Sequence, residues 1–187
     1  MNVLIIGNGG RENAIAWSVY ASPLLRRLFC MPGNPGIADY AKCIDGNILD
    51  NNVVYKCILE HSIDVVIVGP ETPLVNGIVD FLENKNIKVF GPSFRAAKLE
   101  GSKIFAREFC KKYSIPQPNF QSFSNIIKAQ SYIKSMDEKN GYVIKADGLA
   151  SGKGVVVTNN KDEALNYISD LIENEIFGDA GKKILIE

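Results

Sequence analysis

The chain has 187 residues, and 46% of them are hydrophobic, which is enough to bury one large core or two small ones. Its 21 Lys and Arg residues balance 21 Asp and Glu residues, and this zero formal charge argues against nucleic acid or a membrane surface as the main partner. No apolar run is long enough to cross a bilayer, and the first residues lack the basic segment of a signal peptide.

The cysteines indicate a reducing compartment. Cys30, Cys43, Cys57 and Cys110 show no C-x-x-C spacing, and the chain contains one histidine, so the sequence predicts no zinc site. We therefore expect reduced thiols in a cytoplasmic protein.

The N-terminal segment has the pattern of a strand, a glycine turn and a helix. Residues 2–6 form an apolar run, the turn is GNGGRE at 7–12, and apolar residues recur at helical spacing over 15–20. This is the opening unit of a Rossmann-like sheet, in which the helix N-terminus favours an anion. The dinucleotide fingerprint is incomplete because Glu12 replaces its third glycine, so a smaller phosphate or a ribose hydroxyl fits better than NAD. A tight turn that binds no ligand is the alternative.

The rest of the N-terminal half alternates between strands and helices. Further strands are predicted at 24–31, 64–68 and 88–90, with helices at 51–60 and 73–83. The loops PGNPG (32–36) and GPETP (69–73) follow two of these strands. Ligands bind at the carboxyl ends of strands in open α/β sheets, so we expect these two loops and GNGGRE to share one crevice. Glu71 is a candidate for binding ribose hydroxyls there; alternatively, its charge stabilises the start of the next helix.

The composition changes near residue 93, where a second region begins. Ser93 is placed to cap a helix, 101–103 opens another helix, and the prolines of 115–118 indicate a linker. We therefore divide the chain into a Rossmann-like domain (1–100), a helix and linker (101–118) and a second domain (119–187). The second domain is predicted to contain a strand, a helix at 126–136, a hairpin, a helix at 161–173 and a strand at 183–187.

Residues 141–158, GYVIKADGLASGKGVVVT, are predicted to form a hairpin whose loop holds phosphate. Two runs of β-branched and aromatic residues flank small residues that leave backbone N–H groups unshielded, and Lys145 and Lys153 stand at the ends of the loop. The loop is not a Walker A motif, because its glycine spacing is one residue too short and Gly154 replaces the magnesium-binding hydroxyl residue. A hairpin that folds over a nucleotide is favoured, and an ordinary hairpin with a solvated turn is the alternative.

Five motifs occur in order along the whole chain: GNGGRE, PGNPG, VGPETPLVNGIVD, FGPSFRAAKLEGSK and VIKADGLASGKGVVV. Together they resemble the glycinamide ribonucleotide synthetase family of the ATP-grasp superfamily. The resemblance implies an α/β fold: a Rossmann-like parallel-sheet domain followed by the first part of an ATP-grasp domain of α+β type. It also implies an ATP-dependent ligase that joins glycine to 5-phosphoribosylamine through a glycyl phosphate in purine biosynthesis.

The resemblance also implies site residues. The residues expected to contact ATP are Lys103, Lys145, Gly148, Ala150, Ser151, Gly152, Lys153, Gly154 and Glu187. The residues expected to contact phosphoribosylamine are Gly9, Gly10, Arg11, Glu12, Asn34 and Glu71. The two lysines Lys103 and Lys145 match those that bind ATP phosphates, and Glu187 matches the first residue of the hinge that holds adenine. The implied cofactors are ATP and Mg²⁺ or Mn²⁺, the other substrates are small molecules, and the intact enzyme is expected to be a monomer.

Two features depart from the family pattern. Asn13 stands where the family commonly has histidine, and because an amide does not titrate, we expect a hydrogen-bonding or structural role there. The chain also stops inside the predicted strand 183–187, at less than half the length of the family enzyme. We therefore expect the catalytic residues and the magnesium ligands to lie outside these 187 residues, with no metal site within them and no ligase activity of the chain alone.

Two other functions fit parts of the pattern. One is another ATP-grasp carboxylate–amine ligase, such as a carboxylase or a formate-using relative. The other is a nucleotide-binding Rossmann module that depends on a dinucleotide. GNGGRE together with KADGLASGKG favours the glycine ligase, and the missing third glycine counts against the dinucleotide module.

Overall fold

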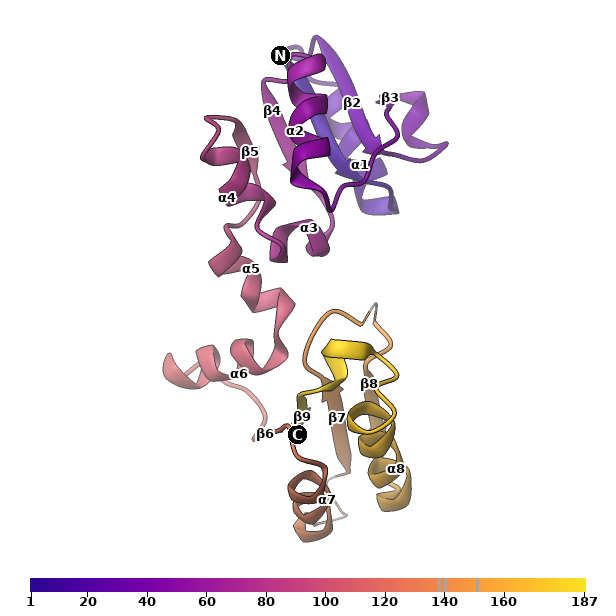
Figure 1. The fold of residues 1–187 in the computed structure, drawn as a ribbon, viewed down its shortest axis with the longest axis vertical. Coiled ribbons are helices and arrows are strands. Elements are labelled where there is room, and N and C mark those ends of the chain that lie inside the picture. Colours follow the sequence, from indigo (N-terminus) through magenta and orange to yellow (C-terminus); the bar gives the residue numbers. More distant parts are fainter. Residues whose placement is uncertain (138, 140, 151) are drawn as a thin grey trace. The chain divides into compact units, whose positions relative to one another are not determined.

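The computed structural model describes residues 1–137, 139, 141–150 and 152–187 (Figure 1). The chain forms two compact units, Met1–Ala97 and Lys98–Glu187, called here the first and second units. None of the helices in the described part of the chain is long and apolar enough to cross a membrane.

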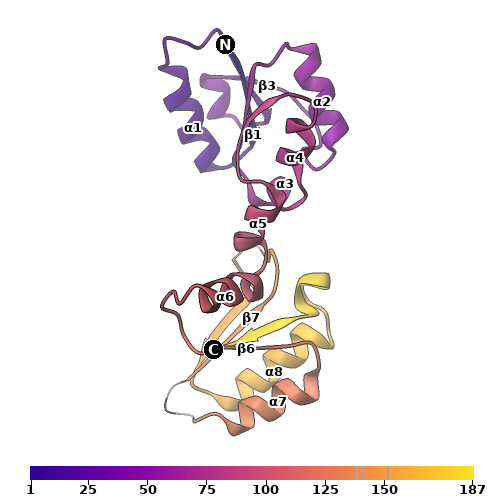
Figure 2. The same ribbon diagram turned by 90° about the vertical axis from the view of Figure 1, so that its left-hand side faces the viewer.

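The first unit is built on a parallel sheet with the strand order β3-β2-β1-β4-β5. Its strands are β1 (Asn2–Gly7), β2 (Arg27–Pro32), β3 (Lys42–Cys43), β4 (Val65–Val68) and β5 (Lys88–Phe90). Its helices are α1 (Gly10–Tyr20), η1 (Ile37–Asp39), α2 (Asn51–Glu60), α3 (Glu71–Val75) and α4 (Ile78–Glu83). The helix α5 (Phe94–Gly101) follows β5. Figure 2 shows α1 on one face of this sheet and α2 and α4 on the other.

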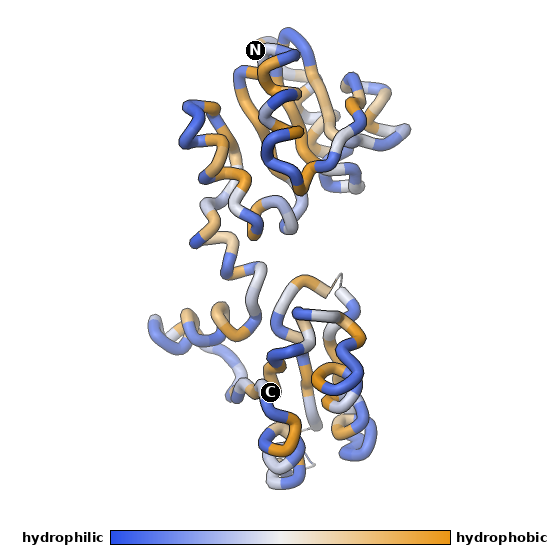
Figure 3. Tube along the Cα trace, in the orientation of Figure 1, coloured by the Kyte–Doolittle hydropathy of each residue, from blue (hydrophilic) through white to orange (hydrophobic). Residues whose placement is uncertain are grey.

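The central strand explains why this sheet is covered on both faces. All six residues of β1 are buried, and side chains alternate between the faces of a strand. Leu4 and Ile6 enter the core beside α2 and α4, whereas Val3 and Ile5 enter the core beside α1. Figure 3 shows the hydrophobic residues concentrated along these central strands. The predicted Rossmann-like sheet is therefore confirmed.

The structure corrects two predictions in the first unit. The predicted helix 73–83 is wrong as one element: it is two short helices, α3 and α4, separated at Gly77. Gly77 has φ +82°, a left-handed conformation that an α-helix does not contain. The sequence analysis also missed β3, because two exposed residues carry no strand pattern. The helix 51–60 is confirmed in full, with Asp50 as its N-cap.

The second unit contains an antiparallel sheet with the strand order β6-β9-β7-β8. Its strands are β6 (Gln121–Phe123), β7 (Tyr142–Ala146), β8 (Val155–Thr158) and β9 (Ile184–Ile186). Its helices are α6 (Lys103–Lys112), α7 (Ile126–Ser135), α8 (Lys161–Ile172) and η3 (Gly178–Gly181). The predicted hairpin of β7 and β8 is confirmed, with Ile144 opposite Val156.

The side chains of β7 alternate between the hydrophobic core of the second unit and the opposite face of the sheet. Tyr142, Ile144 and Ala146 are buried in one hydrophobic cluster with residues of α7 and α8. Val143 and Lys145 therefore face the other side of the sheet, where α6 contacts β9. Ser102 caps α6, and its hydroxyl oxygen accepts a hydrogen bond from the Phe105 N–H at 3.0 Å.

We predict that Ile144→Ala destabilises the second unit by about 2–5 kcal/mol, because it opens a cavity in a closed core. Val157→Ala, on the paired strand of the same hairpin, is the matched control, because Val157 is 74% exposed. Amide hydrogen exchange measures the effect: protection of β7 and β9 should fall in the first variant, while protection of β1 is unchanged. Equal losses in the two variants would contradict this assignment of the core.

Candidate functional site

Three loops meet at the carboxyl ends of β1, β2 and β4. The Gly33 N–H donates to the Gly7 carbonyl at 3.1 Å, and the Gly69 N–H donates to the Ile6 carbonyl at 3.0 Å. The Asn34 side-chain amide donates to the Asn8 carbonyl at 2.8 Å. The loops GNGGRE, PGNPG and GPETP therefore lie together, as the sequence analysis expected, and hydrogen bonds fix their positions.

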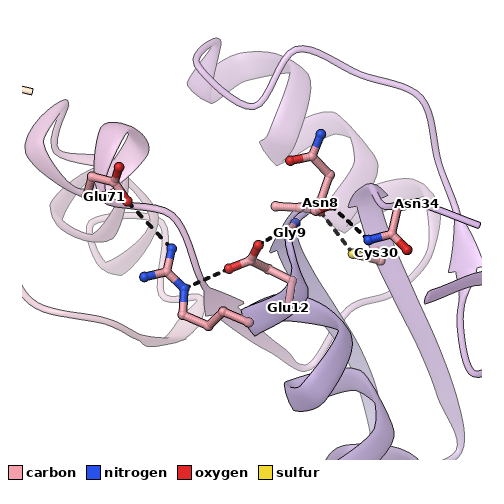
Figure 4. Close-up of polar contacts among 8 residues, drawn as sticks. Asn8, Gly9, Glu12, Cys30, Asn34 and Glu71 are labelled. Atoms are coloured by element: carbon pink, nitrogen blue, oxygen red, sulfur yellow. Dashed lines mark hydrogen bonds and ion pairs between the residues drawn. The ribbon is translucent and has the colours of Figure 1, made fainter. Parts of the chain in front are cut away.

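The carboxylate of Glu12 lies at the centre of these loops, although the residue is only 3% exposed. It accepts hydrogen bonds from the Gly9 N–H at 2.6 Å and from Arg11 Nε at 2.9 Å (Figure 4). A Cβ atom at Gly7 would lie 2.6 Å from Glu12 Cγ, and one at Gly69 would also overlap this side chain. The predicted contact of Glu12 with substrate stays a prediction; in this structure its carboxylate is bound by Gly9 and Arg11.

Arg11 joins this centre to the solvent-facing part of the site. Its guanidinium contacts Glu12 and also lies 3.5 Å from Glu71 Oε2. Glu71 is the first residue of α3, where its charge is favourable for the helix, and its carboxylate is half-exposed. A ligand contact and a role in stabilising the helix start are therefore both compatible with its position. Asn13 packs against the same loops, because a Cβ atom at Gly36 would overlap its amide nitrogen.

A hollow of about 310 Å³ lies beside the three loops. It is lined by Asn8, Pro32, Gly46, Asn47, Ile48, Leu49, Pro70, Thr72 and Pro73. The predicted residues lie on the same three loops but do not line the hollow themselves; they are Gly9, Gly10, Arg11, Glu12, Asn34 and Glu71. The lining segment 46–49 was not predicted, because it follows the short strand β3, which carries no strand pattern in the sequence.

The second unit holds a separate group of charged side chains. Glu187 accepts from Lys145 Nζ at 2.5 Å and from Arg107 Nε at 2.5 Å. Burial alone would raise the pKa of Glu187, but hydrogen bonds from Arg107 and Lys145 outweigh it and hold the pKa below its usual value. Arg107 was missed by the sequence analysis, and its signal was the helical spacing of four residues from Lys103.

Lys103 lies next to this group but binds backbone atoms. Its ammonium donates to the Ala146 carbonyl at 2.9 Å and to the Gly148 carbonyl at 2.8 Å. Burial lowers the pKa of Lys103, Asp147 opposes this shift, and the charge of Lys145 adds to it. Asp147 in turn accepts hydrogen bonds from the Ser102 hydroxyl and the Ile104 N–H, both at 2.9 Å. The start of α6 is therefore attached to the end of β7, and the predicted phosphate contact of Lys103 stays a prediction.

The glycine-rich loop connects these lysines to β8. Gly154 fits only without a side chain, because a Cβ atom there would lie 2.6 Å from the Cβ of Ala150. Gly152 has φ +77° with open space around it, and Lys153 is exposed. Ser151, also predicted to contact ATP, lies outside the described residues.

Comparison with known proteins decides the family. A family model described as phosphoribosylglycinamide synthetase, N domain, matches residues 1–100, and one described as the ATP-grasp (A) domain of the same synthetase matches residues 101–187. The chain belongs to the phosphoribosylglycinamide synthetase family. The predicted family resemblance is thereby confirmed over the whole chain.

Individual relatives agree with this family membership. The phosphoribosylamine–glycine ligase of Mesorhizobium japonicum is 46% identical over 187 residues, covering 100% of this chain and 43% of that protein. The crystal structure of the Thermotoga maritima ligase has a TM-score of 0.80 and 31% identity, with coverage of 100% and 43%. A biotin carboxylase domain from Hydrogenobacter thermophilus, solved with MgADP, ADP and bicarbonate, shares only the fold, with a TM-score of 0.76, 20% identity and coverage of 100% and 43%. This family member thus spans less than half the length of these relatives.

The described residues of this synthetase family member contain no group of three or more His, Cys, Asp or Glu side chains that is placed to hold a metal ion. The charged groups around Lys103 and Glu187 are three cations, Lys103, Arg107 and Lys145, and three carboxylates, Glu100, Asp147 and Glu187. This donor set suits an anion, because ammonium and guanidinium groups bind phosphate oxygens.

We predict that the Glu187 contacts make the stability of the second unit pH-dependent. The folded-state pKa lies below the unfolded-state value, so the ionised carboxylate stabilises the fold above the unfolded pKa, and this contribution is lost as pH falls through the folded pKa. Urea unfolding at a series of pH values, followed by NMR signals of β7, measures this loss. Glu187→Gln should reduce the loss, whereas Glu108→Gln, an exposed position on α6, should leave it unchanged. The same acid sensitivity in both variants would refute the assignment.

Proposed function

We propose that this chain provides the substrate-binding and nucleotide-binding parts of an ADP-forming phosphoribosylamine–glycine ligase. Residues 1–100 bind phosphoribosylamine, 101–118 open the ATP-grasp region, and 119–187 hold the nucleotide. The observation that carries the proposal is the placement of Lys145 and Lys103 together at the base of the glycine-rich loop. The names of the relatives support the same activity.

The charges of the second unit suit a polyphosphate. Lys103, Arg107 and Lys145 lie together there, and the nearby charge of Lys145 contributes to lowering the pKa of Lys103. A triphosphate adds negative charge at this point and relieves that repulsion. The lysines therefore hold the phosphates, and the backbone of Gly148, Ala150, Ser151, Gly152 and Gly154, together with Lys153, covers them. Glu187, at the end of β9, is left to contact the adenosine part.

These contacts explain what the chain contributes to the reaction. Phosphoryl transfer to a carboxylate depends mainly on positioning and on stabilising charge, and both are functions of fixed lysines. A covering loop excludes water, which would otherwise hydrolyse an acyl phosphate. The products of the complete reaction are glycinamide ribonucleotide, ADP and phosphate. We assign no metal ligand within the described residues, and we place the Mg²⁺ or Mn²⁺ that accompanies ATP on other parts of the ligase.

The first unit supplies the phosphoribosylamine contacts. Arg11 presents an exposed guanidinium that Glu12 and Glu71 hold in place, and this suits a phosphate or ribose hydroxyls. Gly9, Gly10 and Asn34 surround it at the strand ends. The four cysteines are free thiols, which supports the assignment to the cytoplasm. The proposed partners are small molecules alone, and the complete enzyme is proposed to be a monomer.

Nucleotide binding tests the proposal on the chain itself. We expect ATP–Mg²⁺ to raise its melting temperature, whereas NAD has no effect. Lys145→Ala should weaken ATP binding by roughly tenfold or more, because it removes a charge-assisted contact to phosphate. Lys134→Ala, at an exposed position on α7, is the matched control and should bind ATP normally. Tight NAD binding without any response to ATP would favour the dinucleotide module instead.

Turnover tests the reaction. Residues 1–187 are joined in frame to the remaining part of the Mesorhizobium japonicum relative, and ADP release is measured with and without glycine. Lys145→Ala should reduce turnover by about two to three orders of magnitude, as expected when a transition-state charge contact is removed. Asn13→Ala should reduce it far less. Equal losses would contradict the phosphate role of Lys145, and ADP release with another carboxylate but not glycine would indicate a different ATP-grasp ligase.

A further inference from the structure

A second hollow in the first unit lies at the end of the sheet opposite the three loops. It has a volume of about 300 Å³ and is lined by Arg27, Leu28, Phe29, Lys42 and His61. Arg27 is the first residue of β2 and Lys42 the first residue of β3, whereas the substrate loop PGNPG begins at the other end of β2. Phe29 and Lys42 are direct neighbours in the sheet. The hollow is therefore separate from the proposed ligase site.

The charge of this hollow is positive. Within the part of the chain that the structure describes, Arg27 and Lys42 form no ion pair, and no residue lining the hollow is acidic. The arginines of the proposed ligase site, Arg11 and Arg107, by contrast, each contact a carboxylate. Two uncompensated cations at a concave surface raise the local concentration of anions and favour their binding.

His61 forms one wall of the hollow in a fixed orientation. Its ring stacks on Phe29, with ring centroids 4.8 Å apart and an angle of 18° between the planes. His61 also ends α2, and a helix C-terminus carries partial negative charge that disfavours an anion. The Asn2 side-chain amide donates to the carbonyls of His61 and Ser62, both at 3.1 Å, and so partly offsets that charge. The imidazole is left available as a hydrogen-bond donor or stacking surface.

The other two hollows described here do not share this positive charge. The hollow of about 450 Å³ beside α8 is lined in part by Asp162, Glu163 and Asp170, which repel anions. The hollow of about 310 Å³ lies beside the three loops of the proposed phosphoribosylamine site and has no charged lining residue. Among the hollows described here, the one at Arg27, Lys42 and His61 alone combines cations with an aromatic wall.

We propose that this hollow is a binding site for a small phosphate-bearing anion, distinct from the ligase site. Arg27 and Lys42 hold the phosphate oxygens, Arg27 with the planar donor geometry that matches them. The imidazole of His61 lies at the side of the bound group and contributes a hydrogen bond or a stacking surface.

The experiment uses His61, which is the only histidine in the sequence and therefore gives a unique imidazole NMR signal. The 187-residue chain is titrated with inorganic phosphate at constant pH and ionic strength, with chloride as the reference anion. We expect a saturable shift of the His61 signal. Arg27→Gln should weaken phosphate binding by roughly tenfold, because it removes a charge-assisted contact. Arg26→Gln changes the net charge equally at the adjacent position outside the hollow and should bind normally.

A second variant and a second ligand complete the test. Lys42→Gln should weaken binding as Arg27→Gln does, which keeps the proposal testable if one variant does not fold. AMP, which adds a planar ring, is compared with phosphate: tighter binding of AMP identifies a nucleotide ligand that stacks on His61, and equal binding identifies the phosphate group alone. The proposal would be overturned if neither phosphate nor AMP gave a saturable shift of the His61 signal. Equal weakening of phosphate binding in Arg26→Gln and Arg27→Gln would also overturn it.

Discussion

The second unit depends on one buried carboxylate with two cationic partners. Glu187 follows β9, Lys145 is on β7 and Arg107 is on α6, so this contact joins two strands and the helix that covers them. An unpaired carboxylate or cation in such a partly buried place would lose hydration energy without compensation. Here each charge is compensated by its oppositely charged partners. This contact holds Lys145 in a fixed position at the base of the glycine-rich loop, and two backbone carbonyls hold Lys103 there. The proposed site for a polyanion is thus formed by charges that already hold one another.

The two units hold their cationic side chains in place in different ways. In the first unit, backbone hydrogen bonds and one carboxylate, Glu12, hold the loops at the strand ends, and Arg11 is the cation that extends from them. In the second unit, side chains from a sheet and a helix are held by one another. Loops carry binding residues well when a rigid scaffold positions them, and here the parallel sheet is that scaffold. Each unit therefore presents cations on a fixed frame.

The sequence predicted the parts of the fold that are encoded locally. The apolar runs of β1 and β4 indicated buried strands, and the capped helix after Asp50 has a complete local signal. The break at Gly77 was missed because a glycine within a helical pattern does not reveal its φ angle. The ion pair of Arg107 with Glu187 and the hollow at Arg27, Lys42 and His61 were missed because each brings together residues distant in the sequence. The roles of Lys103 and Lys145 came from the family resemblance, since spacing alone left an ordinary hairpin open.

The packing of Glu12 against Gly7 and Gly69 also constrains how this protein can change over evolution. Gly69 lies on a different loop from Gly7 and Glu12, yet the three residues share one small volume, because a side chain at either glycine would overlap the glutamate. A substitution at one position therefore alters which residues the other two tolerate. A shorter residue at position 12 would free space for alanine at 69 but would leave the Gly9 N–H without its acceptor. Position 7 would stay constrained by its φ of +126° and by Pro70. The three residues are thus epistatically linked, and we expect them to persist or to be replaced as a set.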